Sequence, residues 1–195
     1  MTTEPDPLAE HVVGSRPIHR GRYLELRIDA IERADGSRAE REIVGHPGAA
    51  AVVAIDGEGR VVLVRQWRVA AGRALLEIPA GTLDRDPGTG ALEDPDTAIE
   101  RELAEETGLR AGSWRKLAAF YTAPGFATEL MHLYLATDLE PAGHAHGPEE
   151  DERLELVRLP VDEALAAVER GEIADAKSLV GLLWLARLQA GEDEA

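Results

Sequence analysis

Three glutamates just before a glycine constrain this chain more than any other feature. Glu102, Glu105 and Glu106 stand in the segment Arg101-Glu102-Leu103-Ala104-Glu105-Glu106-Thr107-Gly108-Leu109. They are related as i, i+3 and i+4, so a helix places them on one side, where their oxygens can converge on a hard cation. Like charges placed so closely repel unless a cation neutralises them. The pattern therefore predicts a helix that presents a divalent metal site.

The residues that flank the glutamates favour a helix from about 95 to 107. Asp94 is a typical N-cap residue, Pro95 suits the first helical position, and Gly108 stands where a left-handed C-terminal cap belongs.

The alternative interpretation is a solvated helical face with ion pairs such as Arg101 to Glu105. At 100° per residue, however, Glu106 falls between Glu102 and the apolar pair Ile99 and Leu103. At least one carboxylate then lies at the edge of the buried face, where it requires an ion pair or a metal.

Composition limits the classes of partner. A chain of 195 residues with 44% apolar content suffices for one main core. A formal charge of -16 argues against nucleic acid or an anionic membrane as the principal partner, so no nucleic acid and no membrane are expected as partners. The chain has no cysteine, no signal-peptide pattern and no apolar run of about 18 residues, so we expect a cytoplasmic location.

Hydrophobic periodicity predicts an α/β chain with three parts: a disordered tail (1–15), a small N-terminal β arm (16–46) and a main domain (47–190). The arm contains alternating strands near 23–31 and 41–44, a hairpin too small to fold alone. Continuous apolar runs at 49–55 and 60–66 predict core strands covered on both faces. Further strands are expected at 75–78, 114–121, 130–136 and 154–159, and helices at 161–169 and 176–188.

The glutamate segment resembles the signature of the Nudix hydrolases. In that pattern a Glu stands eight residues before an Arg-Glu-apolar-any-Glu-Glu-any-Gly-apolar run, and Glu93 and Arg101 to Leu109 match it throughout. The pattern also has a glycine six residues before the first Glu, where this chain has Pro87. Gly81 is the better candidate, which makes the intervening loop six residues longer than in the pattern.

The resemblance implies a Nudix-type α/β/α sandwich with a mixed sheet, plus a small antiparallel N-terminal β arm that exchanges between the subunits of a homodimer. It also implies Mg²⁺ or Mn²⁺ held by Glu102, Glu105, Glu106 and the carbonyl of Ala80, with a nucleoside diphosphate as substrate. Arg101 would orient the acids, with Glu93 as its partner.

A second resemblance, to the subgroup that cleaves ADP-ribose, rests on a proline fifteen residues past the signature. Here that residue is Pro124, followed by Gly125, Phe126 and Glu129. These four would contact the base or ribose, although a Pro-Gly pair is also typical of a plain turn. Gln66-Trp67-Arg68 would present Arg68 to a ribose or diphosphate, with Arg65 and Arg73 as substitutes, and Glu77 would orient the substrate or a water.

The general base of the subgroup lies on an acidic loop, which here is 149–152. We place the base at Glu150, with Glu152 in support and Glu149 as the nearest competitor; His144 and His146 lie in the same loop. The residues implied in catalysis are then Glu150, Arg101, Glu105 and Glu152.

The implied reaction is Mg²⁺-dependent hydrolysis of ADP-ribose to AMP and ribose 5-phosphate. The alternatives are a broader nucleoside-diphosphate-sugar hydrolase and a non-catalytic module that senses ADP-ribose.

Overall fold

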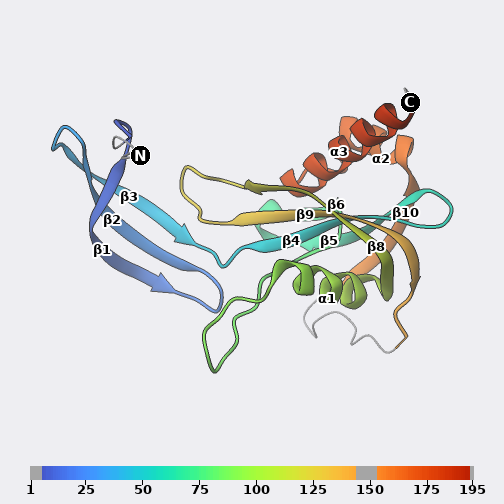
Figure 1. Cartoon of the computed structure of the whole chain (residues 1–195), viewed down its shortest axis with the longest axis horizontal. Coiled ribbons are helices and arrows are strands. Elements are labelled where there is room, and N and C mark those ends of the chain that lie inside the picture. The colour runs from blue at the N-terminus through green and yellow to red at the C-terminus, as the bar shows by residue number, and fades with distance from the viewer. Residues whose placement is uncertain (1–5, 144–152, 194–195) are drawn as a thin grey trace, which may run out of the picture. The chain divides into compact units, whose positions relative to one another are not determined.

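The structure is a computed structural model that describes residues 6–143 and 153–193 (Figure 1). The chain divides into two compact units. The N-terminal unit contains Met1–Pro47 and Tyr121–Glu129, and the main unit contains Gly48–Phe120 and Leu130–Ala195.

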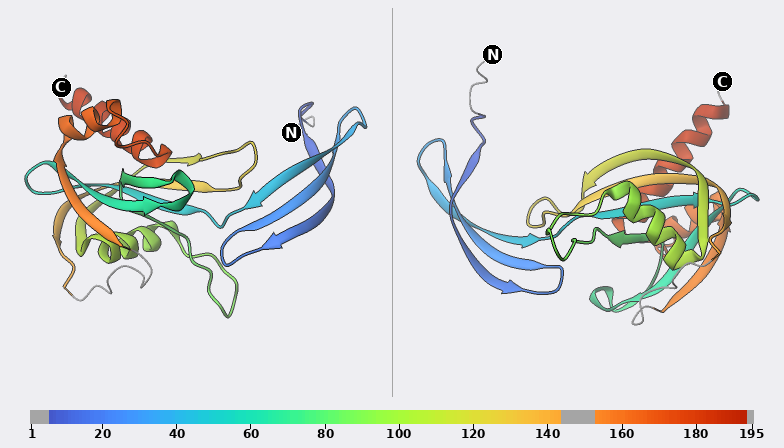
Figure 2. Two further views of the ribbon diagram at one scale, coloured as in Figure 1. Left: turned by 180° about the vertical axis from the view of Figure 1, so that it is seen from behind. Right: turned by 60° about the horizontal axis from the view of Figure 1, so that its bottom comes forward.

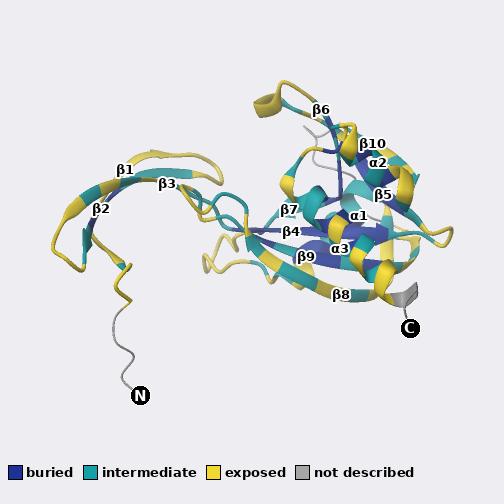
Figure 3. Cartoon of the chain, turned by 90° about the horizontal axis from the view of Figure 1, so that it is seen from above, coloured by how far each residue is buried: buried dark blue, intermediate teal, exposed yellow. Residues whose placement is uncertain are grey.

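The N-terminal unit is built on a three-stranded antiparallel sheet in the order β1-β2-β3. Its strands are β1 (Glu10–Arg20), β2 (Glu25–Arg33) and β3 (Arg38–Gly45). The expectation of a disordered tail over 1–15 is wrong for residues 10–15, which form the first half of β1 and pair with β2. All eleven residues of β1 are exposed, so its order comes from non-local pairing that local periodicity does not reveal (Figure 3).

The main unit is a seven-stranded mixed sheet. The strand order is β10-β5-β4-β9-β8, with β6 paired to β5 and β7 paired to β4. β4 and β9 are parallel, whereas β4 with β5, β5 with β6 and β5 with β10 are antiparallel. The strands are β4 (Ala49–Ile55), β5 (Arg60–Arg68), β6 (Arg73–Glu77), β7 (Ala80–Thr82), β8 (Leu109–Tyr121), β9 (Leu130–Pro141) and β10 (Leu154–Pro160).

Helices cover both faces of this sheet, which confirms the α/β/α sandwich (Figures 1 and 2). The helices are α1 (Pro95–Thr107), α2 (Val161–Glu169) and α3 (Ala176–Asp193), with a 3₁₀ turn, η1, at Val69–Ala71. Alternate residues of β4 point to opposite faces. Ala50 and Val52 pack in the core beneath α1, whereas Ala51 and Val53 pack in the core beneath α2 and α3.

The predicted core strands match the structure closely. β4 has the predicted bounds, and six of its seven residues are buried, which explains its uninterrupted apolar sequence. β7 was not predicted, because its three residues are ordered by pairing with β4 and not by any local pattern. Among residues 6–143 and 153–193, no helix is long and apolar enough to cross a membrane.

Candidate active site

Local signals at both ends fix the position of α1. The side chain of Asp94 accepts a hydrogen bond from the backbone N–H of Asp96 at 2.8 Å. At the other end, Gly108 has φ of 69°, and its N–H donates to the carbonyl of Ala104 at 2.9 Å. Ile99 and Leu103 are buried against the sheet. The predicted helix is confirmed, and its acidic residues stand at the edge of the buried face.

Arg101 gathers carboxylates from both the helix and the loop before it. Its guanidinium donates to Glu93 at 2.9 and 3.2 Å, to Glu102 at 2.7 Å and to Glu105 at 3.0 Å. Asp84 lies 3.6 Å away. We call Asp84, Glu93, Arg101, Glu102 and Glu105 the Arg101 cluster. The predicted pairing of Arg101 with Glu93 is therefore present.

The charges in this cluster reinforce one another. The hydrogen bond to Glu93 and the neighbouring carboxylates raise the pKa of Arg101. In return, the hydrogen bonds from Arg101 lower the pKa of Glu93 despite its partial burial. Four carboxylates share one guanidinium here, so the cluster carries an excess of negative charge.

The short strand β7 brings the backbone against the acidic helix. Ala80 pairs with Ala51 of β4, and the N–H of Ala80 donates to Oε2 of Glu106 at 3.0 Å. At Gly81 a Cβ atom would lie 1.9 Å from the carboxyl carbon of Glu102. Only glycine allows this approach, which agrees with Gly81 as the glycine that precedes the signature helix.

The short strand β7 and the acidic residues of α1 thus supply hard oxygen donors of the kind that Mg²⁺ or Mn²⁺ takes. Within residues 6–143 and 153–193, no three acidic or histidine side chains converge tightly enough to hold a metal ion. The glutamates instead bond to Arg101 and to the backbone of Ala80. Ligation by Glu102, Glu105, Glu106 and the Ala80 carbonyl fits this donor set and stays a prediction.

A second set of charges surrounds Glu77 at the end of β6. Glu77 is 1% exposed and accepts two hydrogen bonds of 2.8 Å from Nε and Nη2 of Arg68. Lys177 of α3 also donates to Glu77, and to Asp175 at 2.8 Å. We call Arg68, Glu77, Asp175 and Lys177 the Glu77 cluster. Burial raises the pKa of Glu77, but Arg68 and Lys177 outweigh it and hold the pKa below its usual value.

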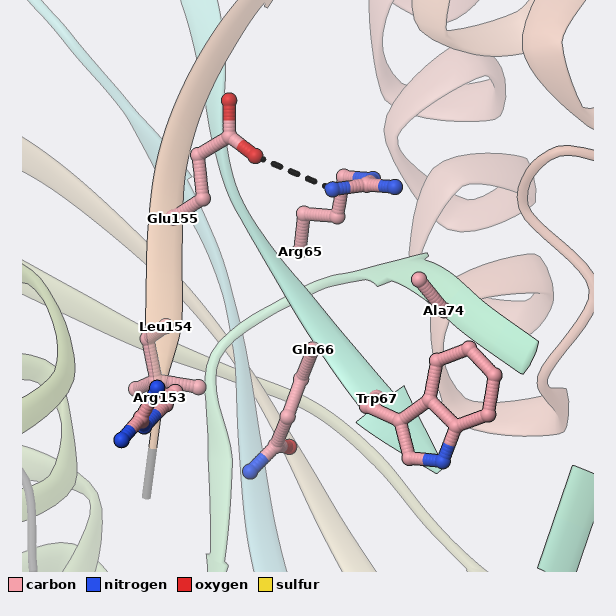
Figure 4. A pocket seen from close by; sticks show the side chains of 7 residues that line it. All are labelled: Arg65, Gln66, Trp67, Ala74, Arg153, Leu154 and Glu155. Carbon is pink, nitrogen blue, oxygen red and sulfur yellow. Dashed lines mark hydrogen bonds and ion pairs between the residues drawn. The ribbon is translucent and has the colours of Figure 1, made fainter. Parts of the chain in front are cut away.

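The two arginines predicted as substitutes for Arg68 have other partners. Arg65 pairs with Glu155 at 3.1 Å, and Arg73 donates to the carbonyl of Gly171 at 3.3 Å. Figure 4 shows the Arg65–Glu155 pair at the rim of a cavity of about 490 Å³, together with the exposed ring of Trp67. Ala74 and the start of β10 complete the lining. Of the three arginines, Arg68 is therefore the one that bonds to the buried Glu77 carboxylate.

The Pro124 loop belongs to the N-terminal unit, where it packs on β3. The N–H of Val44 donates to the carbonyl of Phe126 at 2.7 Å, and the N–H of Thr128 donates to the carbonyl of Val44 at 3.0 Å. The Phe126 ring is 56% exposed. Thr122 donates to Glu129 at 2.5 Å, and His46 lies 3.7 Å from the same carboxylate. The loop is therefore an anchored turn that displays an aromatic ring beside an oriented carboxylate.

Comparison with known proteins assigns the family. The NUDIX domain family matches residues 45–180, which includes both charge clusters. The chain belongs to the NUDIX family. A second family, the nucleoside diphosphate sugar hydrolase N-terminal domain, matches residues 10–44 of this Nudix protein and so covers all three strands of the N-terminal sheet.

Curated relatives cover nearly the whole Nudix chain. The ADP-ribose pyrophosphatase of Bacillus subtilis is 38% identical over 178 residues, which are 91% of this chain and 93% of the relative. The methanol dehydrogenase activator of Bacillus methanolicus is 39% identical over 176 residues, covering 90% and 92%. A crystal structure of an ADP compounds hydrolase shares the fold, with a TM-score of 0.80 at 22% identity, covering 98% of this chain and all of that one.

The lengthened loop before α1 of this Nudix protein is ordered. Arg85 and Leu92 form an isolated β-bridge, and Asp86 accepts hydrogen bonds from the backbone of Gly88 and Thr89 at 3.0 and 2.7 Å. The Glu93 carboxylate at its end accepts from the N–H of Asp84 at 3.3 Å. The extra residues therefore form a closed turn that leaves the Arg101 cluster assembled. The expected base Glu150, its supporting residue Glu152, and Glu149, His144 and His146 lie outside the described residues.

Sequence reasoning missed Lys177 and Asp175. They lie about 100 residues from Glu77 in sequence, at the start of α3. Ser178 beside them accepts a hydrogen bond of 2.9 Å from the N–H of Ile78, so the start of α3 is bonded to the chain next to Glu77. The available signal is the Asp-Ala-Lys-Ser sequence at the start of the helix predicted over 176–188.

Proposed function

We propose that this Nudix protein hydrolyses the diphosphate of ADP-ribose to AMP and ribose 5-phosphate. The observation that carries the proposal is the 38% identity to an ADP-ribose pyrophosphatase over nearly the full length of both chains. The complete acidic helix and the close approach of Gly81 to it support the same chemistry. The name of the Bacillus methanolicus relative describes an effect on another protein, whereas the Bacillus subtilis relative is named for a reaction.

The proposed metal ligands are Glu102, Glu105, Glu106 and the carbonyl oxygen of Ala80. Mg²⁺ is the proposed ion, with Mn²⁺ as its substitute, because both accept carboxylates together with phosphate oxygens and water. A divalent ion at such a site neutralises a diphosphate and lowers the pKa of an attacking water.

Other residues of the chain have the remaining roles in the proposed reaction. Arg101 restrains Glu102 and Glu105, which keeps two mutually repelling acids on one side of α1. Arg68 is proposed to bind the phosphate or ribose, since a guanidinium presents paired N–H groups to oxygen acceptors. Glu150, supported by Glu152, is proposed as the general base that takes the proton of the attacking water.

The nucleoside is proposed to bind at the Pro124 loop. Pro124 and Gly125 form the turn, the exposed Phe126 ring offers a face for stacking, and Glu129 accepts hydrogen bonds from base or ribose donors. The hydrogen bond from Thr122 orients the Glu129 carboxylate before any ligand arrives. A loop organised in this way offers an aromatic face and a carboxylate to a nucleoside.

A broader nucleoside-diphosphate-sugar hydrolase is the second candidate. It is favoured by the match of residues 10–44 to a domain named for nucleoside diphosphate sugar hydrolases. The chemistry at the metal is the same for both candidates, so only the groups on either side of the diphosphate distinguish them.

A homodimer is proposed because the N-terminal sheet leaves apolar side chains exposed. Val12, Val13 and Ile18 of β1 are 60%, 52% and 46% exposed. A three-stranded sheet has little core of its own, and a second copy of the chain would cover these side chains. Sedimentation equilibrium checks this directly. A dimer that dissociates when Val12 and Ile18 are both changed to Asp is expected, and a wild-type monomer at micromolar concentration would contradict the proposal.

The deciding experiment for function is a substrate panel. The purified protein is incubated with ADP-ribose, GDP-mannose, UDP-glucose and diadenosine diphosphate, each with Mg²⁺, Mn²⁺ or EDTA, and the products are separated by chromatography. AMP and ribose 5-phosphate from ADP-ribose, with EDTA abolishing the reaction, are expected. Faster cleavage of the hexose nucleotides would replace ADP-ribose by the second candidate, and turnover in EDTA would refute the metal site.

A further inference from the structure

The Glu77 cluster balances its charge, in contrast to the Arg101 cluster. Two cations, Arg68 and Lys177, face two carboxylates, Glu77 and Asp175: Arg68 bonds to Glu77, and Lys177 bonds to both carboxylates. The side chain of Glu77 is 2% exposed and that of Lys177 is 11% exposed, whereas that of Arg68 is 40% exposed. Of the four side chains, that of the arginine is the most exposed to solvent.

The way Glu77 binds Arg68 leaves one edge of the guanidinium available. Nε and Nη2 point at the two oxygens of Glu77, in a bidentate pair. Nη1 has no hydrogen-bond partner in the described part of the chain, and Nη2 retains a second N–H. These two nitrogens form a second fork with the geometry that suits a phosphate group.

Arg68 also lies within electrostatic reach of the metal-binding helix. Its pKa is raised by the hydrogen bond to Glu77 and further by the charges of Glu106 and Asp175. Glu106 is itself bonded to Ala80, three residues after Glu77. Arg68 is thus close enough to Glu106, a proposed metal ligand, for the two charges to interact.

We propose that Lys177 and Glu77 are positioning residues: Lys177 fixes the Glu77 carboxylate, and Glu77 in turn holds Arg68 with its open edge turned to a phosphate of the substrate. The inference rests on the proposed function for the identity of that phosphate-bearing substrate. It also changes the role predicted for Glu77, which is a buried support for an arginine and does not contact substrate.

The physical need for Lys177 follows from burial. A carboxylate as buried as Glu77 is costly unless its charge is compensated on both oxygens. Arg68 alone would compensate it, but an arginine shared with a substrate phosphate gives up part of that compensation during binding. Lys177 donates to Oε2 of Glu77, which also accepts from Nη2 of Arg68, and Lys177 is itself held by Asp175. Arg68 is thereby able to bind an anion without leaving Glu77.

The first test compares Lys177→Met with Lys177→Arg and with a control, Lys116→Met. Loss of the Lys177 charge is expected to raise KM about tenfold and to change kcat less than about twofold, because the lost contact acts on substrate binding. Lys177→Arg keeps the charge and is expected to restore most of the KM. Lys116 is 69% exposed and pairs with Asp96, so its variant is expected to match wild type. A fall in kcat as large as the rise in KM, without rescue by Lys177→Arg, would overturn the proposal.

A double-mutant cycle separates positioning from mere stability. In an Arg68→Gln background, Lys177→Met is expected to leave KM unchanged within about twofold, because the group it positions is absent. Glu77→Gln combined with Lys177→Met removes both charges together, so no Glu77 carboxylate is left buried without Lys177. It is expected to show the KM of Lys177→Met. An additive tenfold effect of Lys177→Met in the Arg68→Gln background would overturn the proposal.

The substrate used in these assays keeps the two proposals apart. The variants are measured with whichever nucleoside diphosphate the wild type cleaves fastest. Cleavage of GDP-mannose without cleavage of ADP-ribose would refute the proposed function, while the Lys177 comparison would still decide the positioning role. As a second readout, calorimetric titration with inorganic pyrophosphate and Mg²⁺ is expected to show binding about tenfold weaker for Lys177→Met, and equal affinities would overturn the proposal.

Discussion

The Arg101 cluster and the Glu77 cluster contain the same kinds of side chain but differ in charge balance and exposure. In the first, four carboxylates share one arginine, and Glu102 and Glu105 remain 13% and 29% exposed. In the second, two carboxylates meet two cations, and Glu77 is almost fully buried. An acid excess at a partly exposed edge suits the binding of a cation, whereas a balanced, buried set suits a fixed support. The counter-charges therefore decide what a glutamate does here.

The largest effect is expected at Glu106, which lies on α1 beside the Arg101 cluster. Glu106→Gln keeps the volume and the contact with the N–H of Ala80 but removes a proposed metal ligand. We expect kcat to fall by more than about 100-fold, beyond the usual effect of losing an outer partner of a metal ligand. Steady-state kinetics over a Mg²⁺ titration measure the change.

The matched control for this variant is Glu100→Gln. Glu100 is an exposed acid on the same helix, at a position that the Nudix signature leaves unspecified. We expect it to retain wild-type kcat, with circular dichroism showing both variants folded. A Glu106→Gln enzyme with unchanged kcat would remove Glu106 from the metal site and leave the acid excess unexplained.

The next effect tests whether a base comes from outside both clusters. In each cluster the acids are bonded to arginine, lysine or backbone, so neither offers an acid placed to take a proton from water. Glu150→Gln is expected to lower kcat by about 10²-fold, with KM and metal affinity little changed. Glu149→Gln is the control and should retain activity. If the two results are reversed, the base is Glu149.

A smaller loss of kcat is expected when a methyl group is added at Gly81. The added methyl of Gly81→Ala would meet the Glu102 carboxyl carbon at 1.9 Å, so the acid must shift away from the turn. We expect kcat to fall by about tenfold, since small misplacements of reacting groups are costly. Gly57→Ala is the control, because a Cβ there meets nothing within 4 Å. Equal activity of the two variants would show that Glu102 tolerates displacement.

The contrast between the clusters also explains what the sequence could predict. α1 was predicted with its bounds because its stop and start signals, Asp94, Pro95 and Gly108, are local. The Arg101–Glu93 pair was predicted because the family pattern spans it. The core strands β4 and β5 followed from unbroken apolar runs. Each of these features depends on residues that are close in sequence or that belong to one motif.

The features that escaped prediction depend on distant residues. β1 is held by β2, and its own side chains are all exposed, so no burial pattern marks it. Lys177 reaches Glu77 across about 100 residues, and a lysine near a helix start is normally interpreted as solvated. The Arg101 cluster is therefore predictable from a motif. The Glu77 cluster is not, because it depends on the contact between α3 and β6.

A separate effect is expected on stability, and it tests the Glu77 cluster alone. The folded-state pKa of Glu77 is lower than its ordinary value of 4.5, because Arg68 and Lys177 outweigh the effect of burial. As the pH falls, the unfolded chain therefore takes up a proton at this group before the folded chain does, and the ion pairs lose their stabilising effect. The contribution is fully present above about pH 4.5 and declines as the pH falls towards the lowered pKa.

Glu77→Gln lacks this titration. Urea unfolding at neutral pH should show wild type more stable by about 3 kcal/mol, the lower end for breaking a buried pair. The difference should shrink steadily below pH 4.5. A difference that stays constant down to pH 3 would mean that folding does not lower the pKa of Glu77, and that the balance of charges does not account for its burial.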